Sequence, residues 1–316
     1  MCTAISYQTK QHYFGRNLDL ERGYQEQVVV TPRNVPFFFR FAKPQKQHYA
    51  LIGMAAVVNE YPLYFEATNE MGLSMAGLNF PKNAIYQEYE EGKENIAPFE
   101  LIPYLLGKYS SAGAVKEALK KINVVHCNFS NELPVSPLHW MISDREESIT
   151  LECTKDGMKV YENPFGVLTN NPTFDYHLMN MNNYMGVCEG AAKNTLWPKL
   201  PLENYSLGLG ALGLPGDFSS SSRFVKTVFV KTKSVCNGSE KESVNQFFHI
   251  LQAVAMPKGC VLTPGGEYEY TRYSCCCNTD RQIYYYTTYE NPMIQKVDMH
   301  EVDLDGTRLI IKSPML

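Results

Sequence analysis

The fold is decided by two stretches near the start of the chain, Met1-Cys2-Thr3-Ala4-Ile5-Ser6 and Tyr13-Phe14-Gly15-Arg16-Asn17-Leu18-Asp19. Both contain the β-branched and aromatic residues that favour strands. Removal of Met1 leaves Cys2 with a thiol and a free α-amine on one residue. A free thiol has a pKa of about 8.5 and an α-amine has a pKa of about 7.7 to 8.0. The amine can therefore take the thiol proton without a histidine. Cys2 is therefore a candidate nucleophile, although a cysteine at this position is also a common incidental residue.

The second stretch carries two charges close to this candidate nucleophile. Strand alternation places Arg16 on the face opposite Asn17 and Asp19. A charged pair of this kind is usually a solvated sheet edge. If the strand instead runs beside Cys2, Arg16 can stabilise the thiolate and Asp19 can orient the α-amine. The residues alone leave both interpretations open.

The rest of the chain alternates between groups of strands and groups of helices. Apolar spacing predicts two consecutive helices between Ala97 and Ile122, and another over Glu242–Met256. Strands are predicted over Thr3–Tyr7, Tyr13–Asn17, Gln27–Thr31, Tyr49–Val58, Gly72–Leu78, Leu138–Ser143, Ser148–Cys153, Tyr268–Ser274 and Ile283–Thr288. This order predicts a layered α+β body rather than alternating βαβ units.

One domain spanning residues 1–316 is expected, because no repeat or low-complexity linker divides the chain. Its least regular region, residues 182–222, is rich in Gly, Pro and Ser. A loop of that length in a compact domain is more often functional or a subunit arm than idle.

Composition excludes several classes of function. The 29 basic and 33 acidic residues give a net charge of -4, and no basic tract could follow a phosphate backbone, so we expect no nucleic-acid partner. No apolar run approaches the roughly 20 residues that a membrane-spanning helix requires. The N-terminus lacks a secretory apolar segment, which predicts a cytoplasmic protein without membrane association. The nine cysteines are then expected to be thiols, mostly buried.

Other candidate motifs in the sequence lack the context that their usual functions require, so no metal or cofactor is implied. Residues 208–213 match GxGxxG, but Leu214-Pro215-Gly216-Asp217 follows where a dinucleotide-binding turn must open a helix. Cys275-Cys276-Cys277 lacks the spacing of a zinc site, so buried strand cysteines are expected there. No HExxH set and no GxSxG elbow occurs.

Five motifs in order along the chain resemble the choloylglycine hydrolase family, and the similarity extends to at least Tyr289-Glu290-Asn291. They are Met1-Cys2-Thr3, Tyr13-Phe14-Gly15-Arg16-Asn17-Leu18-Asp19, Ala76-Gly77-Leu78-Asn79-Phe80-Pro81, Val167-Leu168-Thr169-Asn170-Asn171-Pro172, and Gly213-Leu214-Pro215-Gly216-Asp217 with Ser222-Arg223-Phe224. The resemblance implies an N-terminal nucleophile hydrolase of four-layer αββα build. It also implies hydrolysis of the amide that joins a bile acid to glycine or taurine, through a thioester on Cys2.

Carried onto this sequence, the resemblance assigns a role to each catalytic position. Cys2 is the nucleophile, its α-amine the base, and Arg16 and Asp19 their electrostatic partners. Asn79 and Asn170 complete the oxyanion site, with Asn171 as the fallback, and Arg223 lies near the thiolate. Family members form homotetramers, so residues 182–222 are a candidate oligomerisation arm.

The sequence indicates the substrate-binding residues less specifically than the catalytic ones. A steroid pocket should be walled by apolar and aromatic side chains. The resemblance indicates Leu18, Tyr24, Phe65, Phe129, Leu133 and Leu138, each of which could equally be an ordinary core or surface residue. Two alternatives remain: a penicillin V acylase-type amidase, against which Asn79 argues, and a catalytically idle, oligomeric steroid-binding protein. Ser74 and Leu207 depart from the family pattern and bear on rate and substrate preference.

Overall fold

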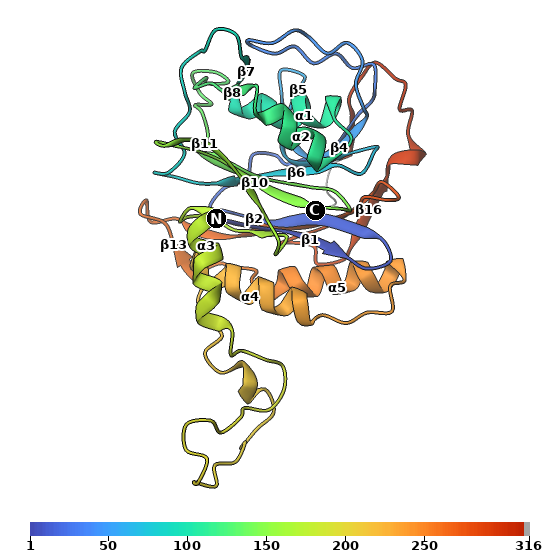
Figure 1. Cartoon of the computed structure of the whole chain (residues 1–316). Helices are drawn as coiled ribbons and strands as arrows, with labels where there is room; N and C mark the ends of the chain where they lie inside the picture. The colour runs from blue at the N-terminus through green and yellow to red at the C-terminus, as the bar shows by residue number, and fades with distance from the viewer. Residues whose placement is uncertain (313–316) are drawn as a thin grey trace.

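The computed structural model describes residues 1–312, and its elements form four layers. Helices α1 and α2 cover one sheet, a second sheet lies beneath the first, and helices α4 and α5 cover the second sheet's outer face (Figure 1). The expected αββα build is therefore confirmed. The helices are α1 (Leu101–Lys108), α2 (Ala112–Leu119), α3 (Phe174–Asn180), α4 (Ser220–Lys233) and α5 (Glu240–Gln252).

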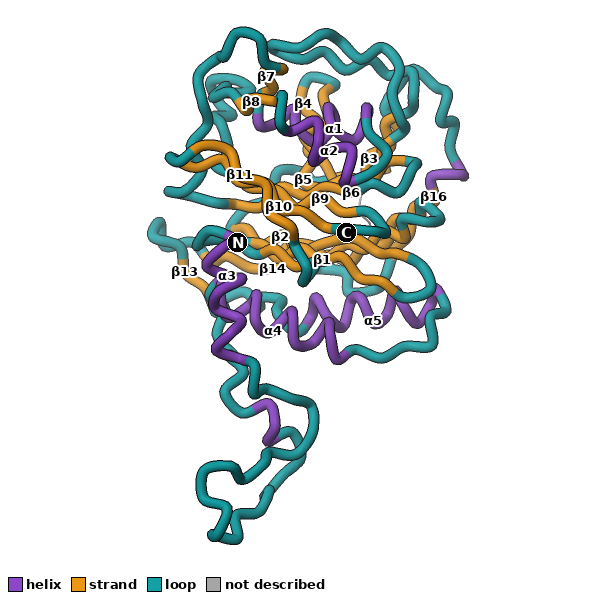
Figure 2. Tube along the Cα trace, viewed as in Figure 1, coloured by secondary structure: helices purple, strands orange, loops and turns teal. Residues whose placement is uncertain are grey.

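The sheet that carries Cys2 has the strand order β12-β1-β2-β14-β15-β16, with β13 paired to β14. Its strands are β1 (Cys2–Gln8), β2 (His12–Leu20), β12 (Val167–Leu168), β13 (Val261–Leu262), β14 (Tyr268–Asn278), β15 (Ile283–Thr288) and β16 (Gln295–Asp298). All neighbouring pairs are antiparallel. Strands from both ends of the sequence therefore meet around Cys2 (Figure 2).

The facing sheet has the order β11-β10-β9-β6-β5-β4-β3-β17. Its strands are β3 (Gln27–Thr31), β4 (Leu51–Val58), β5 (Tyr61–Asn69), β6 (Ser74–Asn79), β9 (Leu138–Ser143), β10 (Ser148–Thr154), β11 (Gly157–Glu162) and β17 (Ile310–Lys312). A separate parallel pair joins β7 (Glu94–Ile96) and β8 (Ile122–Val124). The sequence did not predict β5, which is the strand that carries Glu66.

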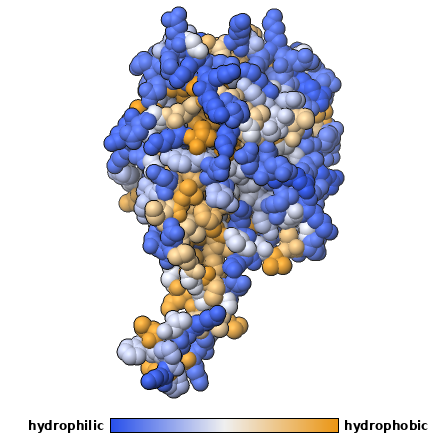
Figure 3. Space-filling model, in the orientation of Figure 1, coloured by the Kyte–Doolittle hydropathy of each residue, from blue (hydrophilic) through white to orange (hydrophobic). Residues whose placement is uncertain are grey.

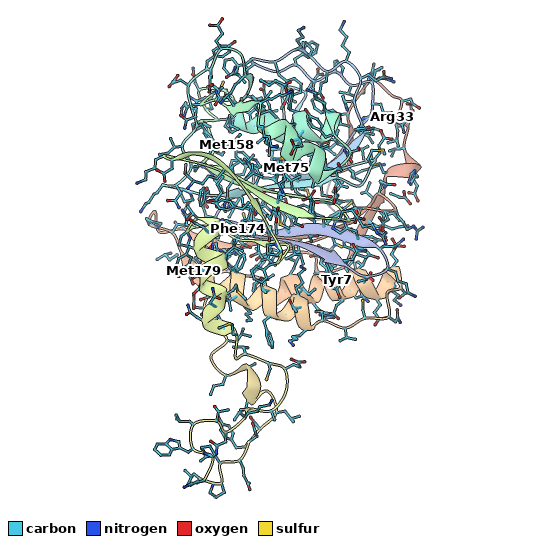
Figure 4. The ribbon with its side chains drawn as sticks, in the orientation of Figure 1. Tyr7, Arg33, Met75, Met158, Phe174 and Met179 are labelled. Carbon is cyan, nitrogen blue, oxygen red and sulfur yellow. The ribbon has the colours of Figure 1, made fainter. Side chains whose placement is uncertain are left out.

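Two apolar cores hold the layers together. One fills the space between the sheets and beneath α4 and α5, where Tyr7 of β1 contacts Phe247 of α5 with ring centroids 6.4 Å apart. The other packs α1 and α2 onto the facing sheet and includes Met75. Figure 4 labels Tyr7 and Met75, one in each sheet. Because the central strands are covered on both faces, eight of the nine residues of β2 are buried.

A close approach of β2 to β14 depends on Gly15. A Cβ added there would lie 2.0 Å from the carbonyl oxygen of Cys275, so any larger residue would force the strands apart. Cys275, Cys276 and Cys277 are all buried in β14, as predicted, and all nine cysteines are free thiols.

Residues 182–222 leave the body as a long excursion that begins after α3 (Figure 1). Its GxGxxG match forms a three-residue 3-10 turn, Leu209–Ala211, followed by loop, so the expected structural turn is confirmed. The region is less irregular than predicted at its end, because Ser220–Ser222 already belong to α4. Ser219 caps this helix by accepting a hydrogen bond from the Ser222 N–H.

Candidate active site

Cys2 is the first residue of β1 and is 2% exposed. Strand β1 pairs with β2 in a register that sets Cys2 opposite Leu18 and Ala4 opposite Arg16. On its other side β1 pairs with β12, after which the chain reaches Asn170. The backbone N–H of Cys2 donates to Oδ1 of Asn170 at 2.8 Å. The fold therefore joins three distant segments at the candidate nucleophile.

Arg16 reaches from β2 into the facing sheet and is completely buried. Its Nη1 donates to the carbonyl oxygens of Gly77 at 2.5 Å and Phe65 at 3.1 Å. Within residues 1–312, its Nη2 is buried and has no hydrogen-bond partner. Burial opposes the charge, but the negative charges of a Cys2 thiolate and of Glu66 outweigh it, so the pKa of Arg16 is raised. The guanidinium thus remains a permanent cation behind Cys2.

Asp19 lies on the opposite face of β2, as the alternation predicted, and is also completely buried. Its Oδ1 accepts a 2.6 Å hydrogen bond from the Thr271 hydroxyl. Its Oδ2 is buried and has no partner among the described residues. One carboxylate oxygen is therefore fixed, and the other is left to accept a hydrogen bond.

Arg223 comes from the first turn of α4 and is 1% exposed. Its Nη1 donates to the carbonyl oxygen of Cys2 and, at 2.7 Å, to Oγ1 of Thr3. Its Nη2 donates to Oδ1 of Asn170 at 2.7 Å. Burial lowers the pKa of Arg223, and the charges of Asp19 and Cys2 oppose that shift. Arg223 therefore locks the backbone of Cys2 to Asn170.

The Asn170-Asn171 doublet is resolved by these contacts. The Asn170 side chain contacts Cys2 and donates from Nδ2 to the carbonyl oxygen of Asn79 at 2.7 Å. The Asn171 side chain donates instead to the carbonyl oxygen of Pro81 at 2.7 Å. Buried His177 holds the Asn170 backbone, with its Nε2 3.0 Å from the carbonyl oxygen. Asn170, rather than Asn171, lies at Cys2.

Met1 covers Cys2 by extending the β1–β2 ladder by one residue. Its α-ammonium donates to the Asp19 carbonyl oxygen at 2.7 Å, and the Asp19 N–H donates to the Met1 carbonyl oxygen at 3.0 Å. The ammonium also forms an ion pair with Glu269 of β14. Burial lowers the pKa of this α-amine, against the charges of Cys2 and Asp19.

Three polar residues around this group were not predicted from the sequence. They are Thr271, which holds Asp19; Glu269, which pairs with Met1; and Glu66, which accepts 2.6 Å hydrogen bonds from the Tyr273 and Tyr284 hydroxyls and lies 4.0 Å from Arg16 Nε. Burial raises the pKa of Glu66, and Arg16 opposes that shift. In the sequence, Glu66 could have been noticed as a single acidic residue between the apolar residues Phe65 and Ala67.

The proposed wall residues fall into two groups. Leu18 pairs with Cys2, Leu138 pairs with Asn79, and the carbonyl oxygen of Phe65 binds Arg16. Tyr24 joins this group, because its ring centroid lies 6.3 Å from that of Phe65. Phe129 and Leu133 form a second group: the Phe129 N–H donates to the Leu133 carbonyl oxygen, and the Phe129 ring packs on Tyr61.

The structure also has a cavity away from the residues around Cys2. A cavity of about 990 Å³ is lined from α1 and the loop before β4, including Tyr104, Lys108 and Lys43. No cluster of His, Cys, Asp or Glu within residues 1–312 could hold a metal ion. In the same range, no helix is long and apolar enough to cross a membrane.

Comparisons with known proteins agree on one family. The model of linear amide C–N hydrolases, choloylglycine hydrolase family, matches residues 2–312. A bile salt hydrolase/transferase from Lactiplantibacillus plantarum is 51% identical over 310 residues, which are 98% of this chain and 96% of that protein. The C2A mutant of conjugated bile acid hydrolase from Clostridium perfringens superposes with a TM-score of 0.93 at 37% identity, covering 100% of this chain and 97% of that one. Penicillin V acylase from Agrobacterium tumefaciens shares the fold, with a TM-score of 0.78 at 19% identity over 98% and 90% of the two chains.

Proposed function

Because the chain belongs to the choloylglycine hydrolase family, it is a linear amide C–N hydrolase, and we propose that it hydrolyses the amide joining a bile acid to glycine or taurine. The names of its relatives, conjugated bile acid hydrolase and bile salt hydrolase/transferase, support this substrate class. The observation that carries the proposal is the position of Cys2 between two buried cations, Arg16 and Arg223, with its nitrogen on Asn170.

The reaction begins at the Cys2 thiol after Met1 has been removed. The α-amine takes the thiol proton, and the thiolate attacks the carbonyl carbon of the bile salt amide. Arg16 stabilises the thiolate, because its unpartnered Nη2 and its buried charge need an anion nearby. Attack produces a tetrahedral intermediate whose oxygen carries the negative charge. Collapse breaks the C–N bond, and the leaving nitrogen takes the proton from the Cys2 ammonium.

Three side chains orient the α-amine. Asn170 Oδ1 already accepts from the Cys2 nitrogen, and Arg223 holds that same oxygen in place. Loss of Met1 converts the peptide N–H into an amine with further protons, and the unpartnered Asp19 Oδ2 is a buried acceptor for one of them. Asp19 and Asn170 thus fix the direction of the base.

The oxyanion site is proposed to consist of Asn79 and Asn170. The Asn170 Nδ2 group binds the Asn79 carbonyl oxygen with one proton and has a second proton to donate. Donors of this kind are worth about 2.7 to 4 kcal/mol each in acyl transfer. Water then hydrolyses the thioester and releases the bile acid.

Substrate selectivity is a first testable consequence. We expect conjugated bile salts to be hydrolysed at least about tenfold more efficiently than penicillin V, a difference of about 1.4 kcal/mol in transition-state binding. The sterol buries more apolar surface against the wall residues, and at about 25 cal/mol per Å² an extra 60 Å² or so suffices. The measurement is kcat/KM for taurocholate, glycocholate and penicillin V with one preparation.

The outcomes of that assay separate the alternatives. Comparable or reversed values would move the chain to the penicillin V acylase type. Absence of hydrolysis of all three substrates, with Met1 retained in the intact mass, would support an idle steroid-binding protein instead. Bile salt hydrolysis by a protein that begins at Cys2 supports the proposal.

Assembly is a second consequence, and we propose a homotetramer that uses the arm, residues 182–222. The arm exposes large apolar side chains, and Leu207 is fully solvent-exposed in the single chain. An apolar strip continues from the body onto the arm (Figure 3). Patches of this kind mark interfaces, and closed symmetric oligomers are the usual solution.

Sedimentation velocity at micromolar concentration should therefore show a tetramer. Trp197→Asp, which places a charge on the arm, should dissociate it. The matched control is Val235→Asp, an exposed apolar position between α4 and α5. A monomeric wild-type profile, or equal effects of the two variants, would contradict the proposal.

A further inference from the structure

His139 is a completely buried histidine that lies between the two asparagine segments of the proposed oxyanion site. It belongs to β9, which pairs with β6, the strand that ends at Asn79. Its ring stacks on the ring of Phe80, the residue after Asn79, with centroids 4.2 Å apart and an interplanar angle of 4°. Its Nε2 lies 3.0 Å from the carbonyl oxygen of Thr169, the residue before Asn170. One imidazole ring therefore contacts both segments.

A buried carboxylate fixes the orientation of this ring. Nδ1 of His139 lies 3.1 Å from Oε1 of Glu152, which is also completely buried. The Thr169 carbonyl oxygen can only accept a hydrogen bond, so Nε2 must carry the proton of that bond. The proton between Nδ1 and Glu152 can reside on either atom, and in both cases Nε2 remains a donor. Glu152 thus sets both the direction of the ring and the position of its donor.

Glu152 extends the same network to helix α3. Its Oε1 accepts a 3.0 Å hydrogen bond from the backbone N–H of Phe174, the first residue of α3. That helix carries His177, whose Nε2 lies 3.0 Å from the Asn170 carbonyl oxygen. Burial lowers the pKa of His177 to about 4, so this second ring is neutral near pH 7. The backbone carbonyl groups on both sides of the Asn170 Cα are therefore held by buried imidazole rings.

We propose that His139, held by Glu152, is a positioning residue for the oxyanion site, an inference that rests on the proposed function. An oxyanion donor stabilises the tetrahedral intermediate only when it is aimed at the position that the oxygen will occupy. Asn79 ends β6 and Asn170 follows β12, and these two strands belong to different sheets. The two donors therefore depend on contacts between the sheets for their relative position. The His139 ring is a rigid, buried contact of this kind.

The expected effect is a loss of kcat rather than a change in substrate affinity. His139→Gln removes the ring that stacks on Phe80, and it replaces two fixed ring nitrogens with one flexible amide. A misplacement of about 1 Å can cost about 100-fold in rate, so we expect kcat for taurocholate to fall at least about 30-fold. KM should stay within about threefold of wild type, because a completely buried side chain does not touch the substrate.

His12→Gln is the matched control. His12 is also a buried histidine, and a hydroxyl group lies 2.8 Å from each of its ring nitrogens. It is six residues from Leu18, the partner of Cys2 in the ladder, which is about 20 Å along β2. This variant should lose thermal stability as His139→Gln does, but its kcat should stay within about threefold of wild type.

A double variant tests whether His139 acts through Asn170. Independent defects multiply, whereas a residue that only positions Asn170 and its partner has less to lose once the Asn170 side chain is gone. We expect kcat of His139→Gln/Asn170→Ala to be at least about fivefold higher than the product of the two single losses predicts. A general loosening of the structure would give the product itself.

The measurements are kcat and KM from product formation by mass spectrometry, the Tm of each variant, and intact masses that establish a start at Cys2. Equal kcat for the two histidine variants, or multiplying losses in the double variant, would overturn the positioning role alone. A wild type that hydrolyses neither taurocholate nor glycocholate overturns the proposed function and the positioning role with it.

If His139→Gln does not fold, Glu152→Asp takes its place in both measurements. Aspartate keeps the carboxylate, but its shorter side chain cannot hold the His139 ring and the Phe174 N–H together. A kcat within about threefold of wild type for Glu152→Asp, or a loss that multiplies with that of Asn170→Ala, would overturn the positioning role.

Discussion

Replacing Cys2 with alanine should lower kcat for taurocholate by about four orders of magnitude or more. The thiol is the atom that forms the acyl-enzyme, and neither Arg16 nor Asn170 can substitute for it. The fold should persist, because the change removes one small buried side chain while the backbone contacts of Cys2 to Asn170 and Arg223 remain. Product formation by mass spectrometry and the far-ultraviolet circular dichroism spectrum measure the two effects.

Cys2→Ser is the matched variant for this test. It keeps the α-amine and puts a hydroxyl in place of the thiol, but an alkoxide is far harder to form than a thiolate. We expect the variant to fold and to turn over poorly. Activity equal to wild type would show that the thiolate is not needed, and an active enzyme that retains Met1 would contradict the role of the α-amine.

The strands that build the catalytic group were largely predictable, because their apolar residues recur with strand alternation. That alternation also placed Arg16 and Asp19 on opposite faces of β2 correctly. Strand β5 was not predicted, because Pro62 and Glu66 interrupt its apolar pattern. The Glu66 carboxylate can be buried in this strand because it accepts hydrogen bonds from two tyrosine hydroxyls and lies close to the Arg16 guanidinium. Helix α4 was not predicted because it begins in a serine-rich stretch that is typical of loops.

The contacts between the site residues depend on the tertiary structure, so the spacing of residues along the sequence could not predict them. Asn170 meets Cys2 only because β12 adds to the edge of β1, and Arg223 meets both because α4 lies beneath that edge. Sequence separation of more than 160 residues carries no local signal for such contacts. The doublet at Asn170 and Asn171 shows this well: the two residues are chemically identical, and only the direction of each side chain distinguishes them.

Asn170→Ala should lower kcat about 100- to 1000-fold, the scale of losing one preorganised polar group in an acyl-transfer site. The substitution removes the acceptor that orients the Cys2 nitrogen and one acceptor of the buried Arg223. It also removes the Nδ2 donor that joins Asn170 to the Asn79 segment. Steady-state kinetics with glycocholate measures the effect, and KM should change less than kcat because the lost contacts are to the nucleophile.

The neighbouring asparagine provides the control for this prediction. Asn171→Ala removes an identical side chain whose amide donates to the Pro81 carbonyl oxygen, away from Cys2, so kcat should stay within about threefold of wild type. Asn170→Asp separates the two functions of Asn170, because it retains an acceptor for Cys2 and Arg223 but loses the donor to Asn79. We expect its kcat to lie between those of Asn170→Ala and the wild type. Equal losses in the two alanine variants would mean that the segment as a whole, rather than the contact between Asn170 and Cys2, supports catalysis.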